Sequence, residues 1–215
     1  MTTTNPTWEP RRLTAVAVEL PEGVAPPGTR GRILHAGLKL YADLGFHGTS
    51  IRQIAAEVGI NSATLYAHYP SKEHILAELV YIGHDGLFRE LEQALADAGP
   101  SPAERLAALV RAQVYSHTDY PLLALVANSE LHALSPESAA PALTLRERSR
   151  QLLYEVLIDG VASGAFSVAD VTLAGIAIGS MGVRVASWFG PDQPYTREQV
   201  AEAFITYAHN IVGAR

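Results

Sequence analysis

The polar and aromatic side chains between residues 61 and 72 are spaced for binding a partner rather than for building a core. A short helix is expected from about Ala63 to His68, and Leu65 is its only strongly apolar residue. The other positions, which include Thr64 and Tyr66, are free to face outward. Because a helix that buries one residue gains little from packing, we expect its hydroxyl, phenol and imidazole groups to contact another molecule.

The residues before this helix predict how it is positioned. Ser50 and Gln53 have the spacing of a capping box, which starts a helix. Ile54 and Ala55 belong to one buried stripe, and Gly59 can adopt the left-handed conformation that ends a helix. The segment therefore predicts a helix-turn-helix, which lays its second helix in the major groove of DNA. From spacing alone, a helical hairpin in an ordinary all-α domain is the alternative.

Residues 30–78 resemble the DNA-binding domain of the TetR family of bacterial transcriptional regulators. The resemblance rests on Gly45-Phe46, Gly48-Thr49-Ser50, Ile54-Ala55, Val58-Gly59, Thr64-Leu65-Tyr66 and His68-Tyr69-Pro70-Ser71-Lys72-Glu73. Tyr69 departs from the pattern conservatively, because the family more often has Phe there. The resemblance implies DNA contacts through Ser50, Ser62, Ala63, Thr64, Tyr66, His68 and Lys72.

The resemblance also divides these contacts into roles. Ser50 and Lys72 would hold phosphates, and Ser62 and Ala63 would face base edges. Thr64, Tyr66 and His68 would contact bases or phosphates. Asn61 is expected to cap the reading helix rather than to touch DNA.

Composition and charge limit the classes of protein to which the chain can belong. The chain has 215 residues and no cysteine, which excludes disulfides and thiolate metal sites and suits a reducing cytoplasm. The net charge of −6 is unusual for a DNA-binding protein, but it is unevenly distributed along the chain. Residues 1–80 hold seven basic and seven acidic residues, whereas residues 81–215 hold nine basic and fifteen acidic residues. The acidic part is therefore expected to point away from DNA.

No secretory signal is visible, and Leu173–Phe189 is too short and too polar for a comfortable membrane span.

We expect an all-α fold with three regions. Residues 1–27 are predicted to form a disordered arm, residues 28–76 the helix-turn-helix domain, and residues 77–215 a helical domain for ligand binding and dimerisation. Arg11 and Arg12 could enter the minor groove, although a solvated tail is the simpler interpretation. In the larger domain, Pro141 is expected to precede a long helix that ends at Gly164.

The helix predicted at Val171–Phe189 carries a stripe of small residues, Gly175, Gly179, Gly182 and Ala186. Each glycine costs about 1 kcal/mol inside a helix, so close approach of another helix is the expected compensation. That helix could belong to the same chain or to a second copy. The TetR resemblance favours a homodimer, in which the stripe would pair with Ala201, Ile205, Ala208 and Val212 of the last helix.

A ligand pocket is expected among the middle helices, since aromatic rings with a few polar groups suit a lipophilic molecule. The candidates are Phe88, Tyr115, His117, Tyr120, Asn128, His132, Tyr154, Arg184 and Trp188. The stretches 128–137, 159–161 and 164–166 are similar to the sensor domains of a TetR subgroup that controls fatty-acid or steroid catabolism. That similarity implies an acyl-CoA effector, with Arg146, Arg148 and Arg150 as partners for its phosphates. A solvated helix face is the alternative for the three arginines.

Enzymatic chemistry and resident metals are not indicated. The histidines are scattered without metal-ligand spacing, no cofactor is expected, and no Gly-x-Ser-x-Gly elbow follows a strand. The resemblance to the TetR family implies a cytoplasmic homodimeric repressor that binds a palindromic operator in double-stranded DNA and is released by a small effector. The alternative is an all-α small-molecule-binding protein or enzyme without sequence-specific DNA binding.

Overall fold

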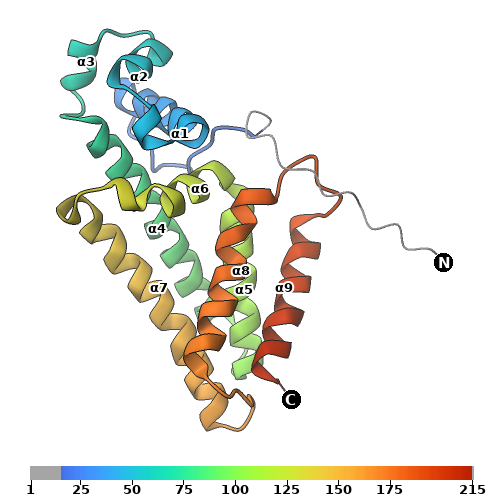
Figure 1. Ribbon diagram of the computed structural model, residues 1–215. Coiled ribbons are helices and arrows are strands. Elements are labelled where there is room, and N and C mark those ends of the chain that lie inside the picture. The colour runs from blue at the N-terminus through green and yellow to red at the C-terminus, as the bar shows by residue number, and fades with distance from the viewer. Residues whose placement is uncertain (1–15, 215) are drawn as a thin grey trace.

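The computed structural model describes residues 16–214, which contain helices and no strands. Figure 1 shows two parts: a small group of helices, here called the head, at one end of a larger helical bundle, here called the body. The head consists of α1 (Thr29–Gly48), α2 (Ile51–Val58) and α3 (Ser62–Tyr66). The body consists of α4 (Lys72–Asp97), α5 (Pro102–Asp119), α6 (Pro121–Ser129), the 3-10 turn η2 (Leu131–Ala133), α7 (Pro136–Ala162), α8 (Val171–Trp188) and α9 (Arg197–Val212).

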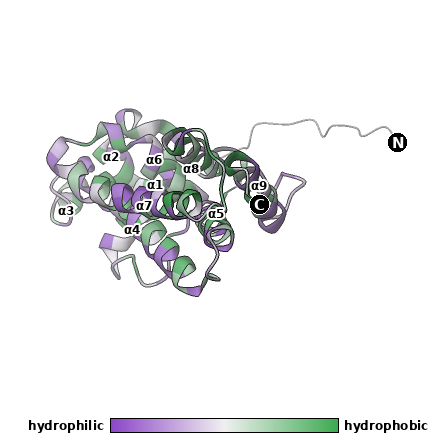
Figure 2. Cartoon of the chain, turned by 90° about the horizontal axis from the view of Figure 1, so that it is seen from below, coloured by the Kyte–Doolittle hydropathy of each residue, from purple (hydrophilic) through white to green (hydrophobic). Residues whose placement is uncertain are grey.

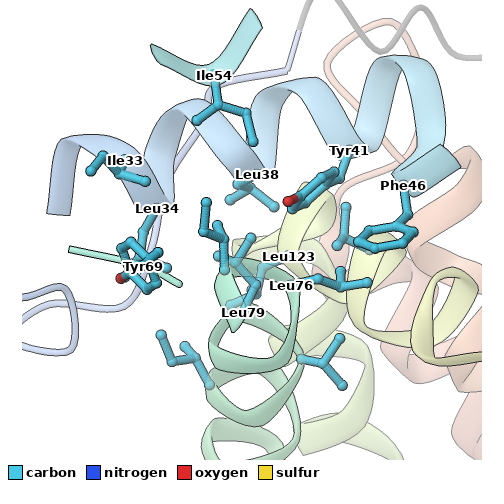
Figure 3. Packing of buried hydrophobic residues seen from close by; sticks show 14 of the residues in the cluster. Ile33, Leu34, Leu38, Tyr41, Phe46, Ile54, Tyr69, Leu76, Leu79 and Leu123 are labelled. Atoms are coloured by element: carbon cyan, nitrogen blue, oxygen red, sulfur yellow. The ribbon is translucent and has the colours of Figure 1, made fainter. Parts of the chain in front are cut away.

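The head and the body share one apolar core. Leu34, Leu38 and Tyr41 of α1 pack with Leu76 of α4 and Leu123 of α6, as Figure 3 shows. The predicted domain boundary at residues 76 and 77 lies inside α4, which continues without interruption from the head into the body. A shift of α4 or α6 therefore moves the support of the head.

The body is a bundle in which α5 contacts α4, α7, α8 and α9. Viewed from below, α9 lies at one side of the molecule beside α5 (Figure 2). A second cluster of buried residues joins these helices and includes Leu106, Leu157, Ile178 and Ala208. Among the described helices, α8 has the length and hydropathy of a membrane span, and here it packs against α5, α6 and α7.

One helix begins earlier than expected. The prediction that a long helix starts after Pro141 is wrong, because α7 begins at Pro136 and contains Pro141. The Ser135 hydroxyl accepts a hydrogen bond from the Ser138 backbone N–H, which caps this start. Pro141 is exposed near the beginning of the helix, while Ala139 and Ala142 on either side of it are buried. Their packing offsets the one backbone hydrogen bond that the proline cannot make.

Candidate DNA-binding surface and ligand cavity

The turn between α2 and α3 is built by local contacts that the sequence predicts. The Ser50 hydroxyl accepts from the Gln53 N–H, and the Gln53 side chain accepts from the Ser50 N–H. Gly59 ends α2 with φ of 76°, in the left-handed region. The Asn61 side chain accepts from the Thr64 N–H at 2.8 Å, which confirms its role as the cap of α3. These contacts fix the direction in which α3 leaves the turn.

A groove of about 870 Å³ runs between the α1–α2 connection, α3 and the start of α4. This reading groove is lined by His47, Gly48, Thr49, Ser50, Ile51, Arg52, Ser62, Tyr66, Pro70, Ser71 and Lys72. It brings together four of the predicted DNA contacts, Ser50, Ser62, Tyr66 and Lys72. Tyr66 is 53 % exposed although its ring is large and apolar. An exposed aromatic ring beside hydroxyl and ammonium groups suits contact with a polar partner.

The other predicted DNA contacts lie close to the groove without lining it. Ala63 is exposed, whereas Thr64 and His68 are half-buried. The Thr64 hydroxyl donates to the Asn61 side chain at 3.1 Å. The groove also includes His47 and Arg52, which the sequence analysis did not select. Both are exposed and lie within three residues of Ser50, so nearness in sequence to the helix cap was the available signal.

Lys72 has partners within the chain that its sequence position did not indicate. Its ammonium group donates to the carbonyl oxygens of Phe46 and Thr49, both at 2.8 Å, and lies 4.2 Å from the centre of the Phe46 ring. Lys72 therefore ties the end of α1 to the start of α4. Since an ammonium group has three donors, one remains for a further acceptor in the groove.

Two carboxylates hold the segment between α6 and α7 in place. The Phe46 backbone N–H donates to the Glu130 carboxylate at 3.0 Å, and Glu130 lies between α6 and η2. The Glu73 carboxylate accepts from the Ser135 backbone N–H at 2.9 Å, and hydrogen bonds from the Ser135 side chain and backbone lower the pKa of Glu73. The segment from Glu130 to Ser135 is thus held to the head at Phe46 and to the start of α4 at Glu73.

A second cavity, of about 610 Å³, lies among α4, α5, α7 and α8. This ligand cavity has an apolar wall that includes Leu87, Leu91, Leu109, Val110 and Leu153. Three arginines and one acid also line it: Arg146, Arg150, Arg184 and Glu147. These four side chains belong to exposed residues, whereas Leu91, Leu109 and Val110 are buried. The cavity therefore combines an apolar interior with a basic rim.

The rim arginines differ in their partners. Arg150 forms an ion pair with Glu147 and lies over the Tyr154 ring. In the described part of the chain, no carboxylate lies within ion-pair distance of Arg146 or Arg184. Two positive charges on the rim are consequently uncompensated.

The predicted ligand-binding residues separate into three groups. Asn128, Tyr154 and Arg184 line the ligand cavity. His117 and Tyr120, again with Asn128, line a small inner cavity of about 20 Å³ between α4, α5 and α6. Four of the predicted residues line neither cavity, and these are Phe88, Tyr115, His132 and Trp188.

Each of the excluded residues has another environment. Phe88 is covered by the Arg148 guanidinium at 4.1 Å from its ring centre, so Arg148 also faces away from the cavity. Tyr115 and Trp188 pack against the cluster around α9, and His132 is exposed on η2. Helical spacing does not reveal which face of a helix a neighbour covers, and this explains why these four residues lie outside the cavities.

The sequence analysis missed His84, which lines both cavities. Its side chain is buried in α4 with 4 % exposure. Burial, and then the charge of Arg146, lower the pKa of His84 to about 4, and the nearby Ala127 backbone opposes this shift. Burial also lowers the pKa of His117. Both imidazoles are therefore neutral near pH 7.

The small-residue stripe of α8 lies inside the chain. A Cβ on Gly175 would meet the Tyr154 ring, and one on Gly182 would meet the Gln113 side chain. Gly179 lines the ligand cavity and has open space where a Cβ would lie. The residues predicted to form a dimer interface pack within one chain or line its cavity, which gives that prediction no support; they are Gly175, Gly179, Gly182, Ala186, Ala201, Ile205, Ala208 and Val212.

Other apolar residues of α8 and α9 are exposed instead. Leu173 and Ile176 on α8 are 64 % and 55 % exposed, and Tyr207 and Ile211 on α9 are 51 % and 37 % exposed. The two helices contact each other, and in Figure 2 both carry the green of apolar residues. We refer to these four residues as the α8–α9 face.

Two expectations concern features outside these sites. Arg11 and Arg12 of the predicted arm lie outside the described residues. Within residues 16–214, no group of three or more histidine and acidic side chains is arranged to hold a metal ion.

Comparisons with known proteins agree on both parts of the chain. Residues 33–79 match the family model described as bacterial regulatory proteins, tetR family, and residues 99–212 match the tetracyclin repressor-like C-terminal domain. The HTH-type transcriptional repressor KstR2 of Mycolicibacterium smegmatis is 29 % identical over 182 residues, covering 84 % of this chain and 88 % of the relative.

Two solved structures share the architecture. A bacterial regulatory protein in the tetR family from Rhodococcus RHA1 superposes with a TM-score of 0.82 and 28 % identity, over 88 % of this chain and 100 % of that one. AibR, solved in complex with isovaleryl coenzyme A and operator DNA, superposes with a TM-score of 0.75 and 25 % identity, over 85 % of this chain and 97 % of that one.

Proposed function

Because the chain belongs to the TetR family of bacterial regulatory proteins, we propose that it represses transcription as a homodimer whose operator affinity falls when an acyl-CoA thioester occupies the ligand cavity. The chain is a DNA-binding transcriptional regulator and not an enzyme. As a reader of bacterial operator DNA, it would act in the cytoplasm. The ligand class rests on one observation, the apolar cavity with two uncompensated arginines on its rim.

The reading groove supports the DNA contacts of the proposal. Tyr66, Thr64, Ser62 and Ala63 would reach base edges from α3, while Ser50, His68 and Lys72 would contact phosphates. The third donor of Lys72 is sufficient for one phosphate oxygen. Arg52 and His47 add basic groups on the same surface.

The ligand proposal follows from matching the two halves of the cavity to two halves of a molecule. The leucine-rich wall suits an acyl group, and Arg146 and Arg184 suit the phosphates of coenzyme A. The solved complex of AibR with isovaleryl coenzyme A supports the choice, because that protein shares the fold. A neutral lipophilic molecule would leave both rim arginines without a counter-charge.

The route from ligand to DNA would run through α6 as well as α4. Asn128 lines the ligand cavity, and two residues later Glu130 holds the Phe46 N–H of the head. A ligand that shifts Asn128 would therefore pull on the α1–α2 connection beside Ser50. The two reading helices of a dimer must lie about 34–36 Å apart to reach successive major grooves. A small change in that separation costs contacts at both half-sites.

The α8–α9 face is our proposal for the dimer interface, in place of the small-residue stripe. Leu173, Ile176, Tyr207 and Ile211 would be covered by the same residues of a second copy. Exposed apolar residues on two adjacent helices mark a surface that gains free energy when it is covered.

The test is an operator-release assay with variants of the rim. A labelled operator fragment is bound to the full-length protein and titrated with decanoyl-CoA, and release is followed by fluorescence anisotropy. In the double variant Arg146→Gln and Arg184→Gln, the effect of the thioester on operator binding should be at least tenfold weaker. The operator affinity without ligand should stay unchanged. Arg148→Gln is the matched control, since Arg148 lies on the same helix and does not line the cavity. Equal responses from all three proteins would rule out the rim as the CoA site.

A further inference from the structure

The innermost part of the ligand cavity contains a polar atom that nothing in the chain satisfies. The Nε2 atom of His84 is buried and has no hydrogen-bond partner among the described residues. His84, Leu87 and Asn128 line both the ligand cavity and the inner cavity, so they form the wall between the two. Buried polar atoms are nearly always hydrogen-bonded in proteins, and an exception calls for an explanation.

A second imidazole lies behind this wall with a defined tautomer. His117 is 2 % exposed, and its Nδ1 is 2.8 Å from the Gln113 carbonyl oxygen. Because a carbonyl only accepts, Nδ1 carries the proton of the neutral ring, and Nε2 is an acceptor. That Nε2 atom is also buried without a partner among the residues described. The inner cavity is therefore lined by two neutral imidazoles, and His84 alone of the two also lines the ligand cavity.

We propose that the inner end of the ligand cavity selects an acyl group that carries a neutral oxygen, a hydroxyl or a ketone, which forms a hydrogen bond with His84. The proposal rests on the proposed acyl-CoA function and specifies which acyl groups are preferred. A plain hydrocarbon chain pressed against His84 would leave its Nε2 desolvated and unpaired. An oxygen at that position would satisfy it.

The surroundings of His84 favour a neutral oxygen over a second anionic group. The adjoining wall is formed by Leu87, Leu91 and Leu109, and a carboxylate there would lose its hydration without gaining a cationic imidazole. Anionic groups have Arg146 and Arg184 on the rim. The inner cavity of about 20 Å³ has room for about one water-sized group. One hydroxyl or ketone oxygen is of that size.

The experiment compares thioesters of equal length that differ at the far end of the acyl group. Decanoyl-CoA, ω-hydroxydecanoyl-CoA and a decanoyl-CoA with a ketone beside its terminal methyl are titrated into the wild-type protein and into His84→Phe by calorimetry. We expect the wild type to prefer an oxygenated thioester by roughly tenfold or more, because leaving a buried polar group unpaired is costly. His84→Phe should lose or reverse this preference. His132→Phe makes the same change at an exposed histidine and should keep it.

The outcomes separate this inference from the proposed function. If all three thioesters bind with the same affinity to both proteins, the proposed function stands and the role of His84 is overturned, as it would be if an internal water satisfied both imidazoles. If no thioester binds, the acyl-CoA proposal fails, and cyclohexanol, cyclohexanone and methylcyclohexane become the probes. The ¹⁵N chemical shifts of the His84 ring should then respond to the alcohol or the ketone and not to the hydrocarbon. No response to any of the three overturns the inference.

Discussion

At the residue scale, Tyr66 combines a large ring, high exposure and a place in the reading groove. Replacing it with alanine should abolish specific operator binding, because one lost base contact costs about 1–3 kcal/mol in each half-site. The protein should still fold, since Tyr66 contributes little to the core. Fluorescence anisotropy measures the affinity, and circular dichroism measures the melting.

Tyr195→Ala provides the control for this substitution. Tyr195 is 48 % exposed in the loop between α8 and α9, so its loss removes a similar ring from outside the groove. Operator affinity should then remain normal. If Tyr66→Ala melts like a protein with a damaged core, Tyr66 is structural and its proposed DNA contact is wrong.

His84 predicts how stability depends on pH. In the unfolded chain it titrates near its ordinary pKa of 6.5, and in the folded protein near 4. Between these values the unfolded state binds more protons, so the free energy of unfolding falls as the pH is lowered, by up to about 1.4 kcal/mol per pH unit for each such histidine. His117 acts in the same direction.

Urea unfolding at several pH values between the two pKa values of His84 measures this slope. His84→Phe should reduce it, because one of the two neutral histidines is removed. His132→Phe should leave it unchanged, since His132 is exposed. An identical slope in His84→Phe would mean that His84 is protonated in the folded protein.

At the element scale, α8 is the helix whose role differs most from expectation. Gly179→Leu places a side chain in open space that belongs to the ligand cavity. We expect the variant to remain folded, with up to about 1 kcal/mol of added helix propensity, and to lose acyl-CoA binding by filling the site. Sedimentation should show an unchanged oligomeric state. A broken dimer with normal thioester binding would restore the stripe as the interface.

The segment between α6 and α7 makes a second prediction at this scale. Glu130→Ala removes the acceptor for the Phe46 N–H, whereas Glu130→Gln keeps an oxygen in that place. In the alanine variant, decanoyl-CoA should still bind, but it should no longer lower the operator affinity. In coupled systems one ligand typically changes the affinity for the other by about 5- to 150-fold. The glutamine variant should respond like the wild type.

Operator affinity measured with and without the thioester gives the coupling directly. Thermal shift confirms in parallel that the ligand still binds each variant. Full coupling in Glu130→Ala would exclude this contact from the route between ligand and DNA, and would leave the continuous helix α4 as the remaining connection.

At the scale of the whole molecule, the α8–α9 face predicts the oligomeric state. Leu173→Glu with Tyr207→Glu should convert a dimer into a monomer, because charges would then be buried at a two-fold interface. Operator affinity should fall sharply although the head is untouched, since a monomer holds one half-site. Sedimentation velocity measures the change.

Ile158→Glu tests whether a charge at any exposed apolar position would convert the dimer into a monomer. Ile158 is 54 % exposed on α7, away from the α8–α9 face, and its replacement should leave the dimer intact. A double variant that remains dimeric with normal operator affinity would require the interface to lie elsewhere.

The sequence by itself determined the features that depend on residues three or four positions apart. The Ser50–Gln53 capping box, the Gly59 helix end and the Asn61 cap all form as predicted. A capping box of the same type starts α9 at Thr196 and Gln199. Such contacts close within one helical turn, so their residue types are sufficient to specify them. The dense spacing of these signals also identified the family and the all-α fold.

Only the tertiary structure decided which face of each helix is covered and by what. The stripe of Gly175 and Gly182 could equally have met a second copy, and it is the packing of Tyr154 and Gln113 that places it inside the chain. Arg146 lines a cavity while Arg148, two residues later, lies on Phe88. His84 became a candidate only because three helices bury its imidazole without a partner. Burial and pairing depend on residues distant in the sequence, and their positions are settled when the helices pack together.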